Sequence, residues 1–169
     1  MKLILDRAHP LPALGRAARI IERRSTIPVL ANLLMTAEAG RLRLRATDLD
    51  IDIDEAVEAD VATRGIVSAP GHMLHDIARK LPAGCQVTLE ASDVALALKS
   101  GRSRFRIPTL PAADWPNIAA GELPHAFDLK ATDLATLIER AQFAVSTEET
   151  RYYLNGIFLH RTAAGALRG

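Results

Sequence analysis

The chain has 169 residues, of which 49% are hydrophobic and 24% are charged, and its formal net charge at pH 7 is +1. This composition supplies enough apolar residues for a core and excludes a disordered, highly charged chain. Because the net charge is close to zero, any affinity for nucleic acid has to come from the placement of the 21 basic residues.

Cys85 is the single cysteine, so an intrachain disulfide is excluded. Asp6 and Arg7 interrupt the N-terminal apolar run too early for a signal peptide, and no apolar stretch is long enough to span a bilayer. We therefore expect a soluble, cytoplasmic protein with no membrane association.

Three stretches place apolar residues at positions i, i+3, i+4 and i+7, which predicts helices with one buried face. They run over 14–21, 74–81 and 134–141. Thr132 is the expected N-cap of the third helix, with Asp133 in its first turn. Alternating residues predict strands over 41–45, 49–57, 86–89, 94–98 and 102–107. Together these elements indicate an α+β fold.

The chain also repeats itself in part. Leu11, Leu14 and Asn32 recur 123 residues later, as Leu134, Leu137 and Asn155. A constant offset predicts two copies of one structural unit, of which the second is incomplete, so we expect the chain to be a fragment. Four prolines between positions 108 and 124 predict an extended linker between the copies.

Alternating carboxylates between Asp48 and Asp54 are the feature most typical of an enzyme. On a strand, these four aspartates point to one face and could hold a divalent metal, as in a metal-dependent phosphoesterase. The alternative is an antiparallel strand with Leu49, Ile51 and Ile53 in the core and its carboxylates in water. We expect this second arrangement and no metal site.

His72 and His75 stand three residues apart on the second predicted helix and could contact one metal ion. A third ligand at helical spacing is missing, so we expect a solvated pair. The sequence also lacks a glycine-rich phosphate loop, a nucleophile elbow and zinc-ligand spacing. We therefore expect no catalytic residue, no metal and no cofactor.

Basic residues follow one side of the first predicted helix, where Arg16, Arg19 and Arg23 recur at i, i+3 and i+7 and Arg24 comes next. Such a face could bind phosphates without reading bases. The alternative is an ordinary solvated helix face.

Two further segments carry exposed positive charge. Arg102, Arg104 and Arg106 alternate along a predicted strand and form a basic edge suited to an acidic partner or to DNA. The segment 151–153 joins an arginine to two tyrosines, a combination that favours contact with a nucleic-acid backbone. Tyrosines that alternate in a half-buried strand are an equally good interpretation of this segment.

Five segments occur in the order and approximate spacing of the bacterial DNA polymerase III beta subunit, and over essentially its whole length the chain resembles that family. The segments are TIPVLANLL (26–34), ATDLD (46–50), SGRSRF (100–105), TLPAADWPN (109–117) and RYYLNG (151–156). The resemblance implies the DNA clamp fold, in which each domain has two helices and two small antiparallel sheets, with three domains per subunit and two subunits per ring. Residues 1–120 would be clamp domain one and residues 121–169 the truncated start of domain two, with the third domain absent.

The resemblance also implies which residues meet DNA and peptides. Helices line the hole of such clamps, so the expected DNA-binding residues are Arg16, Arg19, Arg23, Arg24, Arg151, Tyr152 and Tyr153. Glu148 departs from the family, because a neutral polar residue of the best-known clamp approaches DNA at this position. Leu154 matches part of the cleft that takes short peptide motifs.

For the ring interface, the resemblance points to the second helix and to the last strand of the first domain. The matching residues are Ile77, Leu81, Arg102, Arg104, Phe105 and Ile107. We expect the four apolar side chains of this set to be exposed in the chain.

The implied function is that of a sliding clamp, a non-catalytic processivity factor that encircles duplex DNA during replication without reading its sequence. Expected partners are the DNA polymerase III alpha subunit, the clamp loader and repair polymerases, each through a short peptide motif, and the full-length protein would be a homodimer. Two other interpretations stay open, namely the phosphoesterase and a protein-interaction module that never meets DNA.

Overall fold

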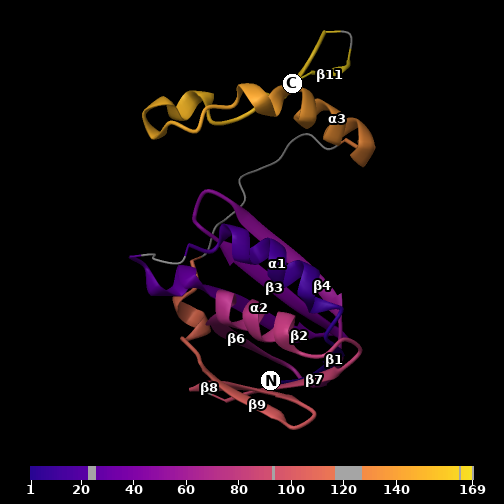
Figure 1. Cartoon of the computed structure of the whole chain (residues 1–169), viewed down its shortest axis with the longest axis vertical. Coiled ribbons are helices and arrows are strands. Elements are labelled where there is room, and N and C mark those ends of the chain that lie inside the picture. The colour runs from indigo at the N-terminus through magenta and orange to yellow at the C-terminus, as the bar shows by residue number, and fades with distance from the viewer. Residues whose placement is uncertain (23–25, 93, 117–126, 164, 169) are drawn as a thin grey trace. The chain divides into compact units, whose positions relative to one another are not determined.

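Two antiparallel sheets and two helices form the first part of the chain (Figure 1). The computed structural model describes residues 1–22, 26–92, 94–116, 127–163 and 165–168. The chain divides into two units, Met1–Ala119 and Ala120–Gly169, and each is described by itself. Because residues 117–126 lie outside the described residues, the predicted linker and the predicted boundary at residue 120 stay predictions.

The larger sheet of the first unit has five strands in the order β5-β1-β7-β8-β9. The smaller sheet has four strands in the order β4-β3-β2-β6. The strands of the larger sheet are β1 (Lys2–Asp6), β5 (Asp60–Thr63), β7 (Gln86–Ala91), β8 (Ala95–Ser100) and β9 (Ser103–Pro108). Those of the smaller sheet are β2 (Asn32–Glu38), β3 (Arg41–Thr47), β4 (Asp52–Glu58) and β6 (Gly65–Pro70).

Helices α1 (Pro10–Ile20) and α2 (Gly71–Lys80) pack against each other and against the smaller sheet, α1 on β3 and β4 and α2 on β2 and β6. Short 3-10 turns, η1 (Pro28–Ala31) and η2 (Ala112–Asp114), complete the unit. The predicted α+β class, with two helices and two antiparallel sheets, is therefore confirmed for this unit.

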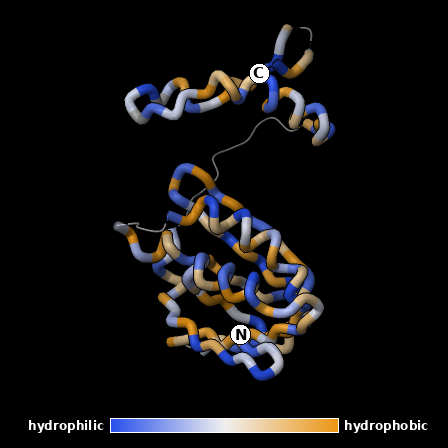
Figure 2. Tube along the Cα trace, in the orientation of Figure 1, coloured by the Kyte–Doolittle hydropathy of each residue, from blue (hydrophilic) through white to orange (hydrophobic). Residues whose placement is uncertain are grey.

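A single apolar cluster joins the two helices to both sheets. Hydrophobic and polar residues alternate along the chain of the first unit (Figure 2). On β3, Leu42 and Leu44 are buried, whereas Arg41 and Arg43 are exposed. All buried members of the cluster lie between Leu3 and Ile107. The core of the first unit thus needs no residue of the second unit among those described.

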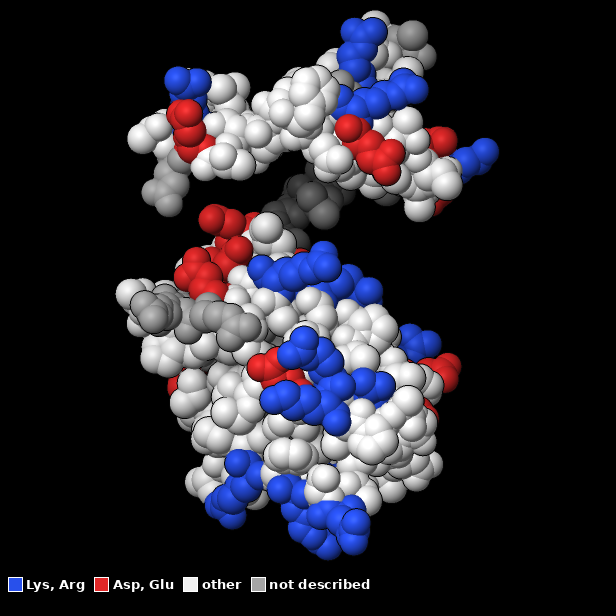
Figure 3. Space-filling model, in the orientation of Figure 1, with Lys and Arg blue, Asp and Glu red and all other residues white. Residues whose placement is uncertain are grey.

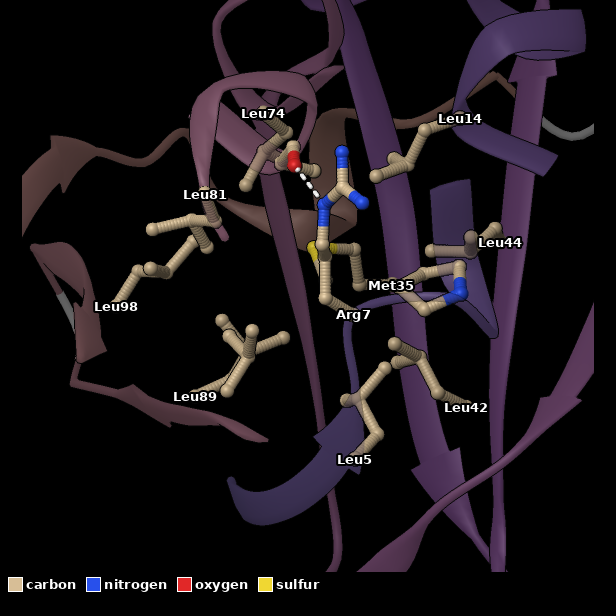
Figure 4. A pocket seen from close by; sticks show the side chains of 13 residues that line it. Leu5, Arg7, Leu14, Met35, Leu42, Leu44, Leu74, Leu81, Leu89 and Leu98 are labelled. Carbon is tan, nitrogen blue, oxygen red and sulfur yellow. Dashed lines mark hydrogen bonds between the residues drawn. The ribbon is translucent and has the colours of Figure 1, made fainter. Parts of the chain in front are cut away.

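A small apolar cavity of about 30 Å³ lies where these layers meet (Figure 4). Leucines from β1, β3, β7, β8 and both helices line it, together with Met35 and the stem of Arg7. Arg7 donates from Nε to the carbonyl oxygen of Ala78 at 2.7 Å and from Nη2 to that of Arg79 at 3.0 Å. These two bonds satisfy carbonyl groups in the last turn of α2, which otherwise lack a donor.

The predicted strand over 49–57 is wrong at its start. Asp48 accepts hydrogen bonds through Oδ1 from the backbone N–H groups of Asp50 and Ile51, at 3.0 and 2.7 Å. This turn places Leu49 at a positive φ of 83°, and β4 begins only at Asp52. Leu49 and Ile51 are exposed rather than buried, because a side-chain hydrogen bond at Asp48 competes successfully with the strand ladder.

The second unit holds α3 (Ala131–Ala141), the 3-10 segments η3 (Gln142–Ala144) and η4 (Glu149–Leu154), and the strands β10 (His160–Arg161) and β11 (Leu167–Arg168). Its helix confirms the third predicted one, and Asp133 lies in the first turn. Thr132 is not the N-cap, since the helix begins at Ala131 and Lys130 takes that position. No described residue of this unit is buried.

In both repeat copies a helix is followed further along by a 3-10 segment and then, directly after that segment, by an asparagine. In the first copy η1 precedes Asn32, whose Nδ2 donates to Ser68 Oγ at 2.7 Å. In the second, η4 precedes Asn155, whose amide nitrogen, when oriented to donate, reaches the carbonyl oxygens of Ser146 and Arg151 at 3.0 and 3.1 Å. Over the described part of the chain, no helix has both the length and the apolar character required to cross a membrane.

Candidate nucleic-acid interface

Helix α1 forms because Pro10 occupies its first turn, where no intrahelical N–H bond is lost, and because its apolar residues share one face. Ala13, Leu14 and Ala17 are buried against the sheet. Arg16 and Arg19 stand on the solvent side of the same helix and are exposed. The sequence prediction of a basic face on this helix is correct for these two residues, whereas Arg23 and Arg24 lie outside the described residues.

Helix α2 adds further positive charge in its last turn. Leu74 and Ala78 face the core, whereas Arg79 and Lys80 are exposed, where cations also interact favourably with the helix dipole. Figure 3 shows Lys and Arg side chains gathered over the face on which α1 and α2 lie. The sequence analysis missed Arg79 and Lys80, although two basic residues before a predicted helix end are a usable signal.

Gly71 and His72 hold the start of α2 against the end of α1. A Cβ at Gly71 would overlap Ile21 Cδ1 and lie 3.2 Å from Leu33 Cγ, so the two helices approach here because no side chain intervenes. A ring nitrogen of His72 lies 2.8 Å from the carbonyl oxygen of Ile21. His72 therefore connects the two helices, and the described residues include no group of three or more metal-ligating side chains.

Arg16 is held by a carboxylate that the sequence analysis did not connect with it. Its Nε donates to Glu55 Oε1 at 2.6 Å, and its Nη2 donates to Glu55 Oε2. The hydrogen bond from Arg16 is the main reason why the pKa of Glu55 lies below its ordinary value, although partial desolvation of the carboxylate opposes it. The same bond raises the pKa of Arg16. Strand alternation places Glu55 beside Ile53 and Val57, on the face that α1 covers, and this pattern could have predicted its orientation.

Asp52 and Asp54 of β4 point to the other face of the smaller sheet and meet arginines of β3. Arg43 Nε lies 2.7 Å from Asp54 Oδ1, and Arg45 Nη2 lies 2.6 Å from Asp52 Oδ2. These aspartates are therefore used in cross-strand ion pairs. The phosphoesterase interpretation loses its main support, because two of its four candidate ligands are engaged and a third, Asp48, forms a turn.

In the second unit, the candidate residues stand on η4. Arg151 has φ −113° and ψ 46°, a break in the helical turn, and its Nε lies 3.1 Å from Glu148 Oε2. Tyr153 and Leu154 are exposed, by 70% and 45%. The side chain of Tyr152 is outside what the structure describes. Glu148, the residue that departs from the family, thus forms an ion pair with Arg151, which is one of the predicted DNA contacts.

The predicted ring-interface residues divide into two groups. Arg102 is exposed in the turn before β9. Arg104 is exposed and Phe105 is 38% exposed on β9 itself, an edge strand of the larger sheet. The expectation that Leu81 and Ile107 are exposed is wrong, since they are only 6% and 1% exposed. Both belong to the core cluster, because β9 and the end of α2 close that core. Ile77 is half-buried against the same cluster.

Comparison with known proteins decides the family. A family model described as the DNA polymerase III beta subunit, N-terminal domain, matches residues 1–119. The chain belongs to this family. It is 45% identical over 167 residues to the beta sliding clamp of Caulobacter vibrioides and 36% identical over 169 residues to that of Pseudomonas aeruginosa. These matches cover 98% and 99% of the chain but only 45% and 46% of the two relatives.

Solved structures of the family agree with the fold. The structure of Caulobacter crescentus pol III beta matches with a TM-score of 0.91 and 45% identity over 98% of this chain and 45% of its own. A DnaN sliding clamp from Bartonella birtlesii, bound to griselimycin, matches with a TM-score of 0.92 and 40% identity over 99% of this chain and 45% of its own. The predicted membership of the DNA polymerase III beta subunit family is therefore confirmed.

Proposed function

We propose that this chain is part of a DNA sliding clamp, a ring that encircles duplex DNA and tethers the replicative polymerase during replication. The observation that carries the proposal is identity of 45% to a beta sliding clamp over 98% of the chain. The chain spans 45% of that relative's length, so a ring would also require segments equivalent to the rest. In this proposal residues 1–120 are the first clamp domain and residues 121–169 begin the second.

The clamp would act topologically, without an active site of its own. The exposed basic residues of α1 and α2 support this, because side chains such as Arg19 and Lys80 offer charge to phosphates but form no base-reading motif among the described residues. We assign DNA contact to this helix face together with Arg24 and the segment 151–153. Contacts of this kind depend strongly on salt and allow sliding along the duplex.

Partners would dock on two other surfaces. The exposed Leu154 is assigned to a cleft for short peptide motifs of the DNA polymerase III alpha subunit, the clamp loader and repair polymerases. The exposed edge of β9, with Arg102, Arg104 and Phe105, is assigned to the contact with a second subunit in a homodimeric ring. Leu81 and Ile107 would support this edge from inside the core rather than contact the partner.

Duplex binding by the 169-residue chain tests the DNA-contact assignment. We expect equal affinity for duplexes of unrelated sequence. The logarithm of the binding constant should fall linearly with the logarithm of the salt concentration, with a slope of about −0.9 for each phosphate neutralised. The double variant Arg24→Ala with Tyr153→Ala should bind more weakly and with a shallower slope. Arg41→Ala is the control, since Arg41 is exposed on the outer face of the smaller sheet. Equal loss in both variants, or none in the double variant, would refute the assignment.

A further inference from the structure

The pair formed by Arg16 and Glu55 uses the atoms with which an arginine binds a phosphate. Both Nε and Nη2 of Arg16 donate to the two carboxylate oxygens of Glu55, which is the bidentate arrangement that guanidinium groups also make with phosphate. Arg16 is nevertheless 53% exposed at its side chain. Arg16 is therefore accessible from solvent, although its Nε and Nη2 groups already donate to Glu55.

Glu55 is fixed in this position by the strand that carries it. It is 25% exposed, and its neighbours on the same face, Ile53 and Val57, pack against the core beneath α1. The other carboxylates of β4, at positions 52, 54 and 58, lie on the opposite face of the sheet. Glu55 is thus the one acidic side chain of β4 that reaches the helix side.

We propose that Glu55 competes with DNA phosphates for Arg16 and so keeps the contact between α1 and the duplex weak and readily broken. The inference rests on the proposed function, because it presumes that the helix face meets DNA. A phosphate would displace the carboxylate from the guanidinium, and the carboxylate would recapture Arg16 when the phosphate moves on. A clamp that slides gains from such a contact, since each step along the duplex then breaks a weaker bond.

The test compares two variants that remove one negative charge each. Glu55→Gln removes the charge that holds Arg16 on the helix face, whereas Asp54→Asn removes a charge that holds Arg43 on the outer face of the sheet. Duplex affinity of the 169-residue chain is measured between 200 and 50 mM salt. One full phosphate contact steepens the salt slope by about 0.9, and in wild type Glu55 leaves this contact only partly formed. Glu55→Gln should therefore gain up to about 3.5-fold more affinity than wild type across this range. Asp54→Asn should keep the wild-type slope.

A second variant shows whether the gain passes through Arg16. Adding Arg16→Ala to Glu55→Gln should remove this gain and bring the slope to the wild-type value or slightly below it. An unchanged slope in Glu55→Gln, or an equal gain in Asp54→Asn, would overturn the inference while leaving the proposed function intact. Absence of salt-dependent duplex binding in wild type and all variants would instead contradict the DNA-contact assignment of the proposed function, and this inference with it.

A measurement on the wild-type chain covers the case in which Glu55→Gln fails to fold. Nuclear magnetic resonance can follow the Arg16 Nε–H signal and the Glu55 carboxyl carbon signal while a duplex is added at 50 mM salt. Competition predicts that both signals shift together, because the phosphate displaces the carboxylate. A Glu55 signal that stays unchanged at saturating duplex would mean that the pair only ties α1 to β4, and the inference would be wrong.

Discussion

Glu55 and Arg16 form a charge pair between α1 and the edge strand of the smaller sheet, and that pair should make stability depend on pH. Because the folded pKa of Glu55 lies below its ordinary value of about 4.3, its stabilising effect is fully present above that value. It is lost as the pH falls through the folded pKa. We therefore expect wild type to unfold at a higher temperature than Glu55→Gln at pH 7.

The difference in melting temperature between these two chains should shrink steadily below about pH 4. Thermal unfolding followed by circular dichroism from pH 7 to pH 3 measures it. High salt should also reduce the difference at pH 7, because ions screen a partly exposed pair. A difference that is constant across this pH range would show that the variant acts through packing rather than through charge.

Single residues also explain which site assignments sequence reasoning could and could not reach. The exposure of Arg19 could be predicted, because the spacing of apolar residues along one helix determines which of its faces is buried. The pairing of Arg16 with Glu55 joins residues 39 positions apart, and no local pattern specifies such a contact. The burial of Leu81 agrees with the apolar spacing over 74–81, whereas the burial of Ile107 depends on how β9 closes a shared core.

At the scale of the elements, the junction of α1 with α2 depends on a glycine. Gly71→Ala should lower the free energy of unfolding by about 1–3 kcal/mol, because the added methyl overlaps Ile21 and crowds Leu33. Urea denaturation measures this change. Gly15→Ala is the matched control, since its new Cβ would find only His75 Nε2 at 3.7 Å.

Gly15 lies inside α1, so an alanine there should stabilise the chain by up to about 1 kcal/mol through helix propensity. The two substitutions add the same methyl group and should change stability in opposite directions. If both stabilise the chain, then the close approach at Gly71 is not needed to join the helices.

The elements were predictable from sequence wherever periodicity alone decides the structure. All three helices follow from apolar spacing, and β3, β7, β8 and β9 from alternation. The segment at Leu49 and Ile51 was predicted wrongly, because the side chain of Asp48 binds the backbone and turns the chain before β4. A sequence that alternates as DLDID does gives no sign of this competition between turn and strand.

At the scale of the whole molecule, the first unit should be stable without the second. Every buried member of its apolar cluster lies between Leu3 and Ile107, and the family model also matches residues 1–119. A chain of residues 1–119 should therefore unfold cooperatively, at the same temperature as the 169-residue chain. Calorimetry of both chains measures this.

The second unit, by contrast, should present exposed apolar surface to solvent. Several of its large apolar side chains are exposed, with Phe143 at 86% and Phe158 at 79%. The 169-residue chain should therefore bind a hydrophobic dye more strongly than the chain of residues 1–119. A marked fall in the melting temperature of the shorter chain would contradict the division into units.

We propose that this chain supplies part of a ring that holds DNA topologically. The most direct measurement uses a chimera, in which the chain replaces the matching 45% of the Caulobacter vibrioides relative. The chimera is first shown to be a dimer by light scattering, and the relative's clamp loader then places it on a nicked circular plasmid. We predict that it stays on the circle through gel filtration at high salt and is released when the plasmid is cut once. A dimeric chimera that leaves circular and linear DNA at the same rate would contradict the account.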